Sequence, residues 1–159
     1  AMLGYYENQK ETNEVLVTDE NGTRWVKTGD LGRMNSDGLL FHEGRIRRIY
    51  LTTFEGQPAK IFPGLIESAV KELPDIFDCT AVARCRAGSA YYEPVAYVIL
   101  HPEHKPWDTL TKELQRICAK SLPTYMWPVE YRFVTEFPHT PIGKVDYRTL
   151  ERMAAEVQL

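Results

Sequence analysis

Residues 138–147 could hold Lys144 at the tip of a stiff loop, because two prolines and a glycine keep a helix out of this stretch. Asp146 can cap a following helix, which the helical spacing of apolar side chains predicts over 147–157. A lysine placed in this way is a fixed point charge that suits an oxyanion or a phosphate. The alternative is that Lys144 is a solvated surface residue, one of 19 Lys and Arg residues in the chain.

The Gly143-Lys144 pair does not belong to a phosphate-binding loop of the Walker type. That motif requires a glycine five residues before Gly143 and a Ser or Thr after the lysine. The chain has Pro138 and Val145 at those positions, so backbone amides could not wrap a phosphate there.

A second candidate is Asp30, which follows a glycine in the turn 27–31 between two expected strands. A carboxylate in such a turn can accept hydrogen bonds from the two hydroxyls of a ribose. The alternative is that Asp30 only stabilises the turn, since Thr, Gly and Asp are common turn residues.

Composition limits the class of protein. With 159 residues, 43% apolar and 26% charged, the chain has the composition of an ordinary globular domain. With a net charge of −3, the chain lacks the excess positive charge that is typical of proteins that bind nucleic acid or an anionic membrane. An RNA-binding domain is further disfavoured because the chain has no aromatic motif of the type that stacks on bases. No apolar stretch approaches the length of a membrane span.

Cysteine and histidine usage predicts neither disulfides nor a metal site. The three cysteines, an odd number with no CxxC pair, argue against a disulfide framework and structural zinc. His101 and His104 have HxxH spacing but lack a third ligand, so we expect them at the surface. This cysteine usage predicts a protein of the reducing cytoplasm, and the first residues show no signal-peptide pattern.

Two kinds of pattern divide the chain near Gly44-Arg45. Up to residue 43 we expect two hairpins and no helix, with strands near 15–17, 24–27, 31–34 and 39–42. Four short strands without a covering helix suit an appendage of a larger sheet. The remainder predicts a strand at 46–51, a loop through Gly56 and Pro58, a helix from Pro63, strands at 79–86 and 94–100, a helix from 108, a strand near 131–137 and the final helix. This order predicts an α+β fold, a small mixed sheet with helices packed on it.

Five segments in order resemble the last core motifs of the adenylate-forming superfamily: acyl-CoA synthetases, adenylation domains of nonribosomal peptide synthetases and firefly-type luciferases. They are Gly4-Tyr5-Tyr6 with Thr12, Trp25-Val26-Lys27-Thr28-Gly29-Asp30-Leu31, Gly44-Arg45, Leu122-Pro123-Thr124-Tyr125-Met126-Trp127-Pro128, and Gly143-Lys144-Val145-Asp146. Each motif is weak alone, but the ordered set covers nearly the whole chain. The resemblance implies that residues 1–43 end a large adenylating domain, 44–47 form a hinge, and 48–159 form a small C-terminal lid.

The resemblance also implies an activity and its residues. Such enzymes activate a carboxylic acid with ATP and Mg²⁺ to an acyl-adenylate, and many then transfer the acyl group to the thiol of coenzyme A or of carrier-protein phosphopantetheine. Asp30 matches the aspartate that holds the ribose hydroxyls, and Arg45 the arginine that contacts the adenylate. Lys144 matches the lysine that bridges the carboxylate and the α-phosphate, and Arg47 the hinge. The phosphate loop, the acid pocket and most of the ATP and Mg²⁺ contacts would belong to the large domain, so the chain alone is expected to be inactive.

Two positions depart from the family pattern. The hinge is usually Asp or Lys, where this chain has Arg47. Gly56 does not align cleanly with the glycine that lines the thiol channel, which leaves the thiol-dependent step open. The alternative from another class is a non-catalytic α+β module that docks a carrier protein or a partner chain.

Overall fold

The structure is a computed structural model that describes residues 2–85, 88, 90–103 and 106–156. The chain divides into two compact units, residues 1–47 and residues 48–159. No helix in the described part of the chain has the length and apolar character needed to cross a membrane.

The first unit contains the two expected hairpins. Strand β1 (Leu16–Thr18) pairs antiparallel with β2 (Arg24–Val26), and β3 (Asp30–Met34) pairs antiparallel with β4 (Leu40–Arg45). A 3-10 turn at Ile46–Arg48 follows and spans the boundary between the units.

The prediction of no helix before residue 43 was wrong, because α1 (Gln9–Val15) precedes β1. The Asn8 side chain caps this helix by accepting a hydrogen bond from the Glu11 backbone N–H at 3.1 Å. The side-chain amide of Asn8 in turn donates to the Glu11 carboxylate at 3.1 Å. The helix is short and carries no apolar stripe, so the cap was the only sequence signal for it.

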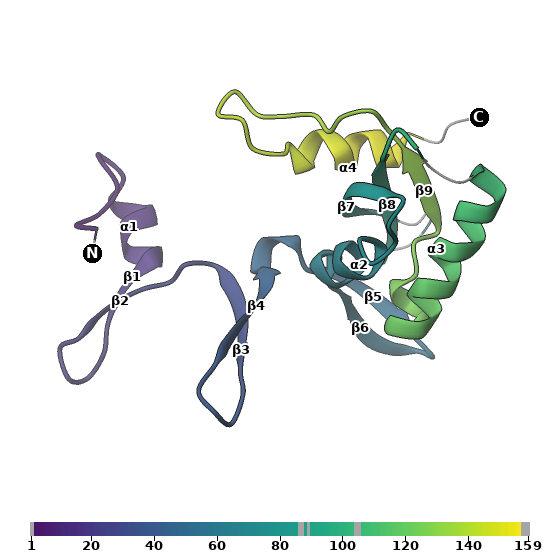
Figure 1. The fold of residues 1–159 in the computed structure, drawn as a ribbon. Helices are drawn as coiled ribbons and strands as arrows, with labels where there is room; N and C mark the ends of the chain where they lie inside the picture. Colours follow the sequence, from purple (N-terminus) through teal and green to yellow (C-terminus); the bar gives the residue numbers. More distant parts are fainter. Residues whose placement is uncertain (1, 86–87, 89, 104–105, 157–159) are drawn as a thin grey trace. The chain divides into compact units, whose positions relative to one another are not determined.

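The second unit is α+β, as predicted (Figure 1). It contains these helices and strands: β5 (Tyr50–Phe54), β6 (Gln57–Ile61), α2 (Pro63–Val70), β7 (Ile76–Cys85), β8 (Tyr92–Leu100), α3 (Trp107–Ser121), β9 (Glu130–Phe133) and α4 (Tyr147–Ala155). Pro63 begins α2 as expected, since its fixed φ suits the first turn of a helix.

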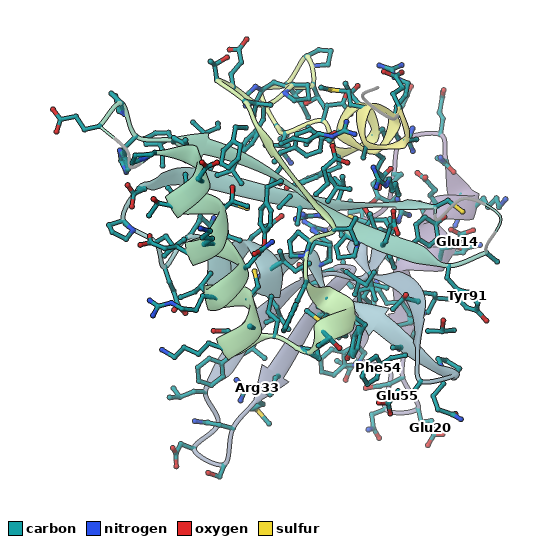
Figure 2. The ribbon with its side chains drawn as sticks, turned by 90° about the vertical axis from the view of Figure 1, so that its right-hand side faces the viewer. Glu14, Glu20, Arg33, Phe54, Glu55 and Tyr91 are labelled. Atoms are coloured by element: carbon teal, nitrogen blue, oxygen red, sulfur yellow. The ribbon has the colours of Figure 1, made fainter. Side chains whose placement is uncertain are left out.

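The expected loop through Gly56 and Pro58 is instead a tight hairpin between β5 and β6. Glu55 and Gly56 both have positive φ (51° and 77°), which matches the right-handed twist of the flanking strands. Pro58 lies inside β6, where a two-stranded sheet has only edge strands and tolerates a proline. Figure 2 shows Phe54 and Glu55 at the tip of this hairpin.

The central sheet has the order β7-β8-β9 and is mixed. Strands β7 and β8 are antiparallel, whereas β9 runs parallel to β8 with Val95 opposite Glu130 and Val98 opposite Phe133. A parallel neighbour requires a crossover connection, and α3 lies in that connection.

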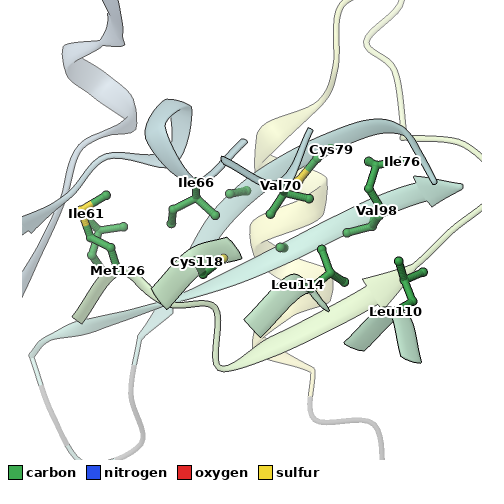
Figure 3. Packing of buried hydrophobic residues seen from close by; sticks show 12 residues of the cluster. Ile61, Ile66, Val70, Ile76, Cys79, Val98, Leu110, Leu114, Cys118 and Met126 are labelled. Atoms are coloured by element: carbon green, nitrogen blue, oxygen red, sulfur yellow. The ribbon is translucent and has the colours of Figure 1, made fainter. Parts of the chain in front are cut away.

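Helices cover both faces of the central sheet, because side chains alternate between two cores along its strands. Ala81 and Ala96 face the first core, while Val82 and Val95 face the second. The first core holds α2 and α3 against the sheet (Figure 3) through Ile61, Ile66, Val70, Ile76, Cys79, Val98, Leu110, Leu114, Cys118 and Met126. The second core holds α4 through Tyr97, Phe137, Leu150 and Ala154.

Leu114→Ala should destabilise the second unit, because the Leu114 side chain is fully buried between α3 and the sheet. The free energy of unfolding should fall by about 2–5 kcal/mol, as for other buried leucines replaced by alanine. Urea denaturation followed by circular dichroism measures it. Leu65→Ala on α2 is the control, because Leu65 is 45% exposed and should cost much less.

Candidate functional site

Asp30 and Arg45 lie opposite each other on β3 and β4. Nε of Arg45 is 2.8 Å from Oδ1 of Asp30, and Nε2 of His42 lies 3.7 Å from the same oxygen. The side chain of Asp30 is 32% exposed and that of Arg45 is 61% exposed. The pair therefore places a carboxylate, whose Oδ1 is buried, beside an exposed guanidinium, groups that bind hydroxyls and anions respectively.

The turn before Asp30 fixes this pair through backbone contacts. Nη1 of Arg45 donates to the Thr28 carbonyl at 3.0 Å, and the Asp30 N–H donates to Oγ1 of Thr28 at 3.2 Å. The Ile46 N–H donates to the carbonyl of Gly29, whose φ of 74° suits glycine. The turn therefore sets where both charged groups point.

The loop that carries Lys144 is held by four hydrogen bonds at its base. The Thr140 N–H donates to the Lys144 carbonyl and the Asp146 N–H donates to the Pro138 carbonyl, each at 2.7 Å. The Gly143 N–H donates to the Thr140 carbonyl at 2.9 Å, and the Lys144 N–H to Oγ1 of Thr140 at 3.2 Å. The stiff loop expected from the sequence is therefore a closed, hydrogen-bonded turn.

The side chain of Lys144 is exposed rather than packed in its own unit. Among the described residues its ammonium forms no ion pair, whereas Lys71, for example, lies 3.4 Å from Asp78. The loop thus presents a cation that its own unit does not neutralise, which is the arrangement needed to receive an external anion.

Helix α4 follows this loop, and its N-terminus is capped by Asp146. The Asp146 carboxylate accepts from the Thr149 N–H at 3.2 Å and from the Thr149 hydroxyl at 2.8 Å. These hydrogen bonds stabilise the ionised form and lower the pKa of Asp146 below its ordinary value.

The other end of α4 is held by two arginines from the sheet. Arg132 donates to the carbonyls of Met153 and Glu156, and Arg84 donates to the carbonyl of Ala154 at 3.5 Å. Positive charge at this end also complements the helix dipole. The Glu130 carboxylate pairs with both arginines, at 2.6 Å from Arg84 and 2.7 Å from Arg132, and they lower its pKa.

The structure brings together two of the four candidate residues. Asp30 and Arg45 form a pair within the first unit. Arg47 is the last residue of that unit and is exposed in the 3-10 turn. Lys144 belongs to the second unit.

The candidate metal pair gains no support. His101 is exposed and packs edge-on against Phe77, with ring centroids 5.4 Å apart. His104 lies outside the described residues. Across the residues that the structure describes, no group of three or more His, Cys, Asp or Glu side chains could hold a metal ion.

Sequence reasoning did not predict that Arg48 and Glu67 form a largely buried ion pair. Their side chains are 18% and 15% exposed. The only sequence signal for Arg48 is its position directly after the candidate hinge Arg47. Burial of the pair depends on elements far apart in the chain, so no local pattern could reveal it.

Comparison with known proteins gives a family match. Residues 65–144 match the model of the AMP-binding enzyme C-terminal domain. Sulfoacetate–CoA ligase of Cupriavidus necator is 32% identical over 91% of this chain, which covers 26% of the ligase. A medium/long-chain-fatty-acid–CoA/3-oxocholest-4-en-26-oate–CoA ligase of Mycolicibacterium smegmatis is 33% identical over 98% of the chain, which covers 27% of that ligase. The chain thus spans about a quarter of the length of these ligases.

Other relatives extend the comparison. A dimodular nonribosomal peptide synthase of Bacillus subtilis is 33% identical over 92% of the chain, which covers 6% of that protein. Among solved structures, the anthranilate CoA ligase AuaEII in complex with anthranoyl-AMP matches 98% of the chain and 28% of its own length. Its TM-score is 0.78 at 28% identity.

Asp146→Ala should loosen the start of α4, because the Thr149 N–H loses its acceptor. We expect faster hydrogen exchange at the Thr149 amide, measured by NMR on the 159-residue chain. The lowered pKa gives the sign of the pH effect: protection is full above the ordinary pKa of Asp and is lost as pH falls through the lowered value.

Asp146→Asn is the matched control, because asparagine also caps helices but does not titrate. In this variant the Thr149 amide should stay protected from hydrogen exchange at neutral pH and should remain protected as the pH falls. Equal exchange at Thr149 in the alanine variant and the parent chain would contradict the capping role.

Proposed function

The chain belongs to the AMP-binding enzyme C-terminal domain family, and from this we propose that it forms the C-terminal part of a ligase that activates a carboxylic acid. In this reaction the acid attacks the α-phosphate of ATP, an acyl-adenylate forms, and pyrophosphate leaves. The remaining machinery, including the acid pocket, belongs in this proposal to a large N-terminal domain.

The observation that carries the proposal is the Lys144 loop. Its ammonium is exposed and lacks an ion-pair partner among the described residues, and the loop is closed by hydrogen bonds at its base. Attack of a carboxylate on a phosphate joins two anions and builds negative charge at their shared oxygens. A preorganised cation at that point stabilises the transition state more than the separated reactants. Lys144 is therefore assigned as the catalytic residue.

The Asp30–Arg45 pair supports nucleotide binding. Asp30 offers its carboxylate as an acceptor to the ribose hydroxyls, and Arg45 offers donors to the adenylate. The distance of 2.8 Å between Nε of Arg45 and Oδ1 of Asp30 keeps the two groups adjacent. Adjacent groups can bind neighbouring parts of one nucleotide.

Mg²⁺ and most of the ATP contacts are assigned to the large domain, as the family resemblance implies. Arg47 is assigned as the hinge because the division between the compact units follows it directly. Rotation at such a position would bring the Lys144 loop to the nucleotide and withdraw it afterwards. Three free cysteines suit the reducing cytoplasm in which we place the reaction.

A second half-reaction, transfer of the acyl group to a thiol of coenzyme A or carrier-protein phosphopantetheine, is part of the proposal. Coenzyme A ligases and nonribosomal peptide synthases are both among the relatives. Gly56 lies at the tip of the β5–β6 hairpin with a φ of 77°, so this turn offers backbone without a side chain for a close approach.

Lys144→Ala in the full-length ligase should lower acid-dependent pyrophosphate release by roughly 10²–10³-fold, the usual loss when a preorganised charge is removed from a transition state. Thioester formation from supplied acyl-adenylate should survive, because that step does not use the loop. Lys112→Ala on α3 is the matched control, since Lys112 is also exposed. Unchanged pyrophosphate release in the Lys144 variant would reject the catalytic role and favour a non-catalytic docking module.

Asp30→Asn should raise the KM for ATP by roughly 10–100-fold, the value of one or two hydrogen bonds to a charged acceptor. Steady-state kinetics of pyrophosphate release measure it at saturating acid. Asp37→Asn, in the turn between β3 and β4, is the control for loss of a nearby exposed carboxylate. Equal KM values for the two variants would show that Asp30 only stabilises its turn.

A further inference from the structure

Two side chains form hydrogen bonds with the backbone of β7 at its open edge. This strand borders the sheet, so the backbone groups of Ala81 that point away from β8 need other partners. The Ala81 N–H donates to Oε1 of Glu67 at 2.9 Å, and the Ala81 carbonyl accepts from Nη2 of Arg48 at 3.0 Å. Arg48 and Glu67 also pair with each other. They therefore replace a neighbouring strand at this point.

The segment that supplies Arg48 also contacts α4. The Arg48 guanidinium lies 4.0 Å from the centroid of the Tyr147 ring, within cation–π range. Two residues further on, the Tyr50 hydroxyl donates to the Glu151 carboxylate. Tyr147 and Glu151 lie one turn apart on the same face of α4. We call Arg48, Tyr50, Tyr147 and Glu151 the clamp.

The clamp lies between the candidate hinge and the candidate catalytic loop. Arg48 follows Arg47 directly, and Tyr147 follows Asp146, which both caps α4 and closes the base of the Lys144 loop. Every contact in this path lies within the second unit.

We propose that Arg48 and Tyr50 are positioning residues that fix the direction of Lys144 through α4. This rests on the proposed function of Lys144. The exposed lysine has no ion-pair partner among the described residues to orient it, so only the loop base and α4 set its direction. A shift of about 1 Å at a reacting group can cost roughly 10²-fold in rate. With the clamp closed, rotation at the hinge moves Lys144 as part of one rigid body.

Hydrogen exchange on the 159-residue chain tests the mechanical part. Tyr147→Leu, which removes the ring, should lower the protection of the Thr140 and Asp146 amides by about 3- to 30-fold, the range of a cation–π contact. Protection of the Leu114 amide in α3 should not change. Tyr147→Phe keeps the ring and should restore the parent values. An equal loss at Leu114, or no loss at the loop, would overturn the proposal.

Kinetics of the full-length ligase test the positioning part. Tyr147→Leu should lower kcat for pyrophosphate release by a similar factor, while the KM for ATP and thioester formation from supplied acyl-adenylate remain unchanged. In a Lys144→Ala background it should cause no further loss, because its effect passes through the lysine. The positioning role would be contradicted if the kcat losses of the Tyr147 and Lys144 variants multiplied in the double variant. It would also be contradicted if Tyr147→Leu slowed both half-reactions equally.

Tyr50→Phe is a second variant that keeps the ring and removes the hydrogen bond to Glu151. It should show the same selective loss at the loop and should fold, since only one oxygen is removed. The hydrogen-exchange experiment does not depend on catalysis. If Lys144→Ala leaves pyrophosphate release unchanged, the proposed function fails, whereas loop protection still decides whether the clamp holds the loop.

Discussion

The ion pair of Arg48 and Glu67 connects three parts of the second unit. It satisfies the backbone of Ala81 at the open edge of β7, and Glu67 also accepts a hydrogen bond from Thr80. Loss of one partner would leave the other charge buried, which typically costs about 3–5 kcal/mol. Because Glu67 lies on α2 and Arg48 at the start of the unit, the pair connects both to the sheet.

Charged residues in the described chain fall into two groups with different environments. Arg84 and Arg132 are 20% and 8% exposed, and each has carboxylate and carbonyl partners. The arginine and lysine assigned to catalysis and nucleotide binding, Arg45 and Lys144, are exposed instead. Arg84 and Arg132 are thus largely buried with their partners. Arg45, although paired with Asp30, and Lys144, which has no ion pair in the described part of the chain, are exposed to an external ligand.

Local patterns predicted most of the second unit. Helix α4 begins after its Asp146 cap, as the spacing of Tyr147 and Leu150 indicated, and the paired strands β7 and β8 correspond to two apolar runs. The mixed sheet with packed helices is confirmed. Errors arose where a short element lacks periodicity, as in α1, or where a residue that usually marks a loop sits in an edge strand, as Pro58 does.

The candidate site was predictable only in part. The turn of Asp30 and the loop of Lys144 have distinctive residue types, so they could be named from the sequence. The pairing of Asp30 with Arg45 required the register of β3 and β4, which fixes which residues face each other. The contact of Arg48 with Tyr147 joins opposite ends of the second unit, and no local sequence pattern encodes it.

The parallel pairing of β9 with β8 makes the support of α4 depend on a distant part of the sheet. Strand β9 reaches its place beside β8 through the crossover that contains α3, as a parallel neighbour requires. Arg132 of β9 in turn holds the last carbonyls of α4. The helix that follows Lys144 is therefore secured at its far end by side chains of β7 and β9, two strands that lie on either side of β8.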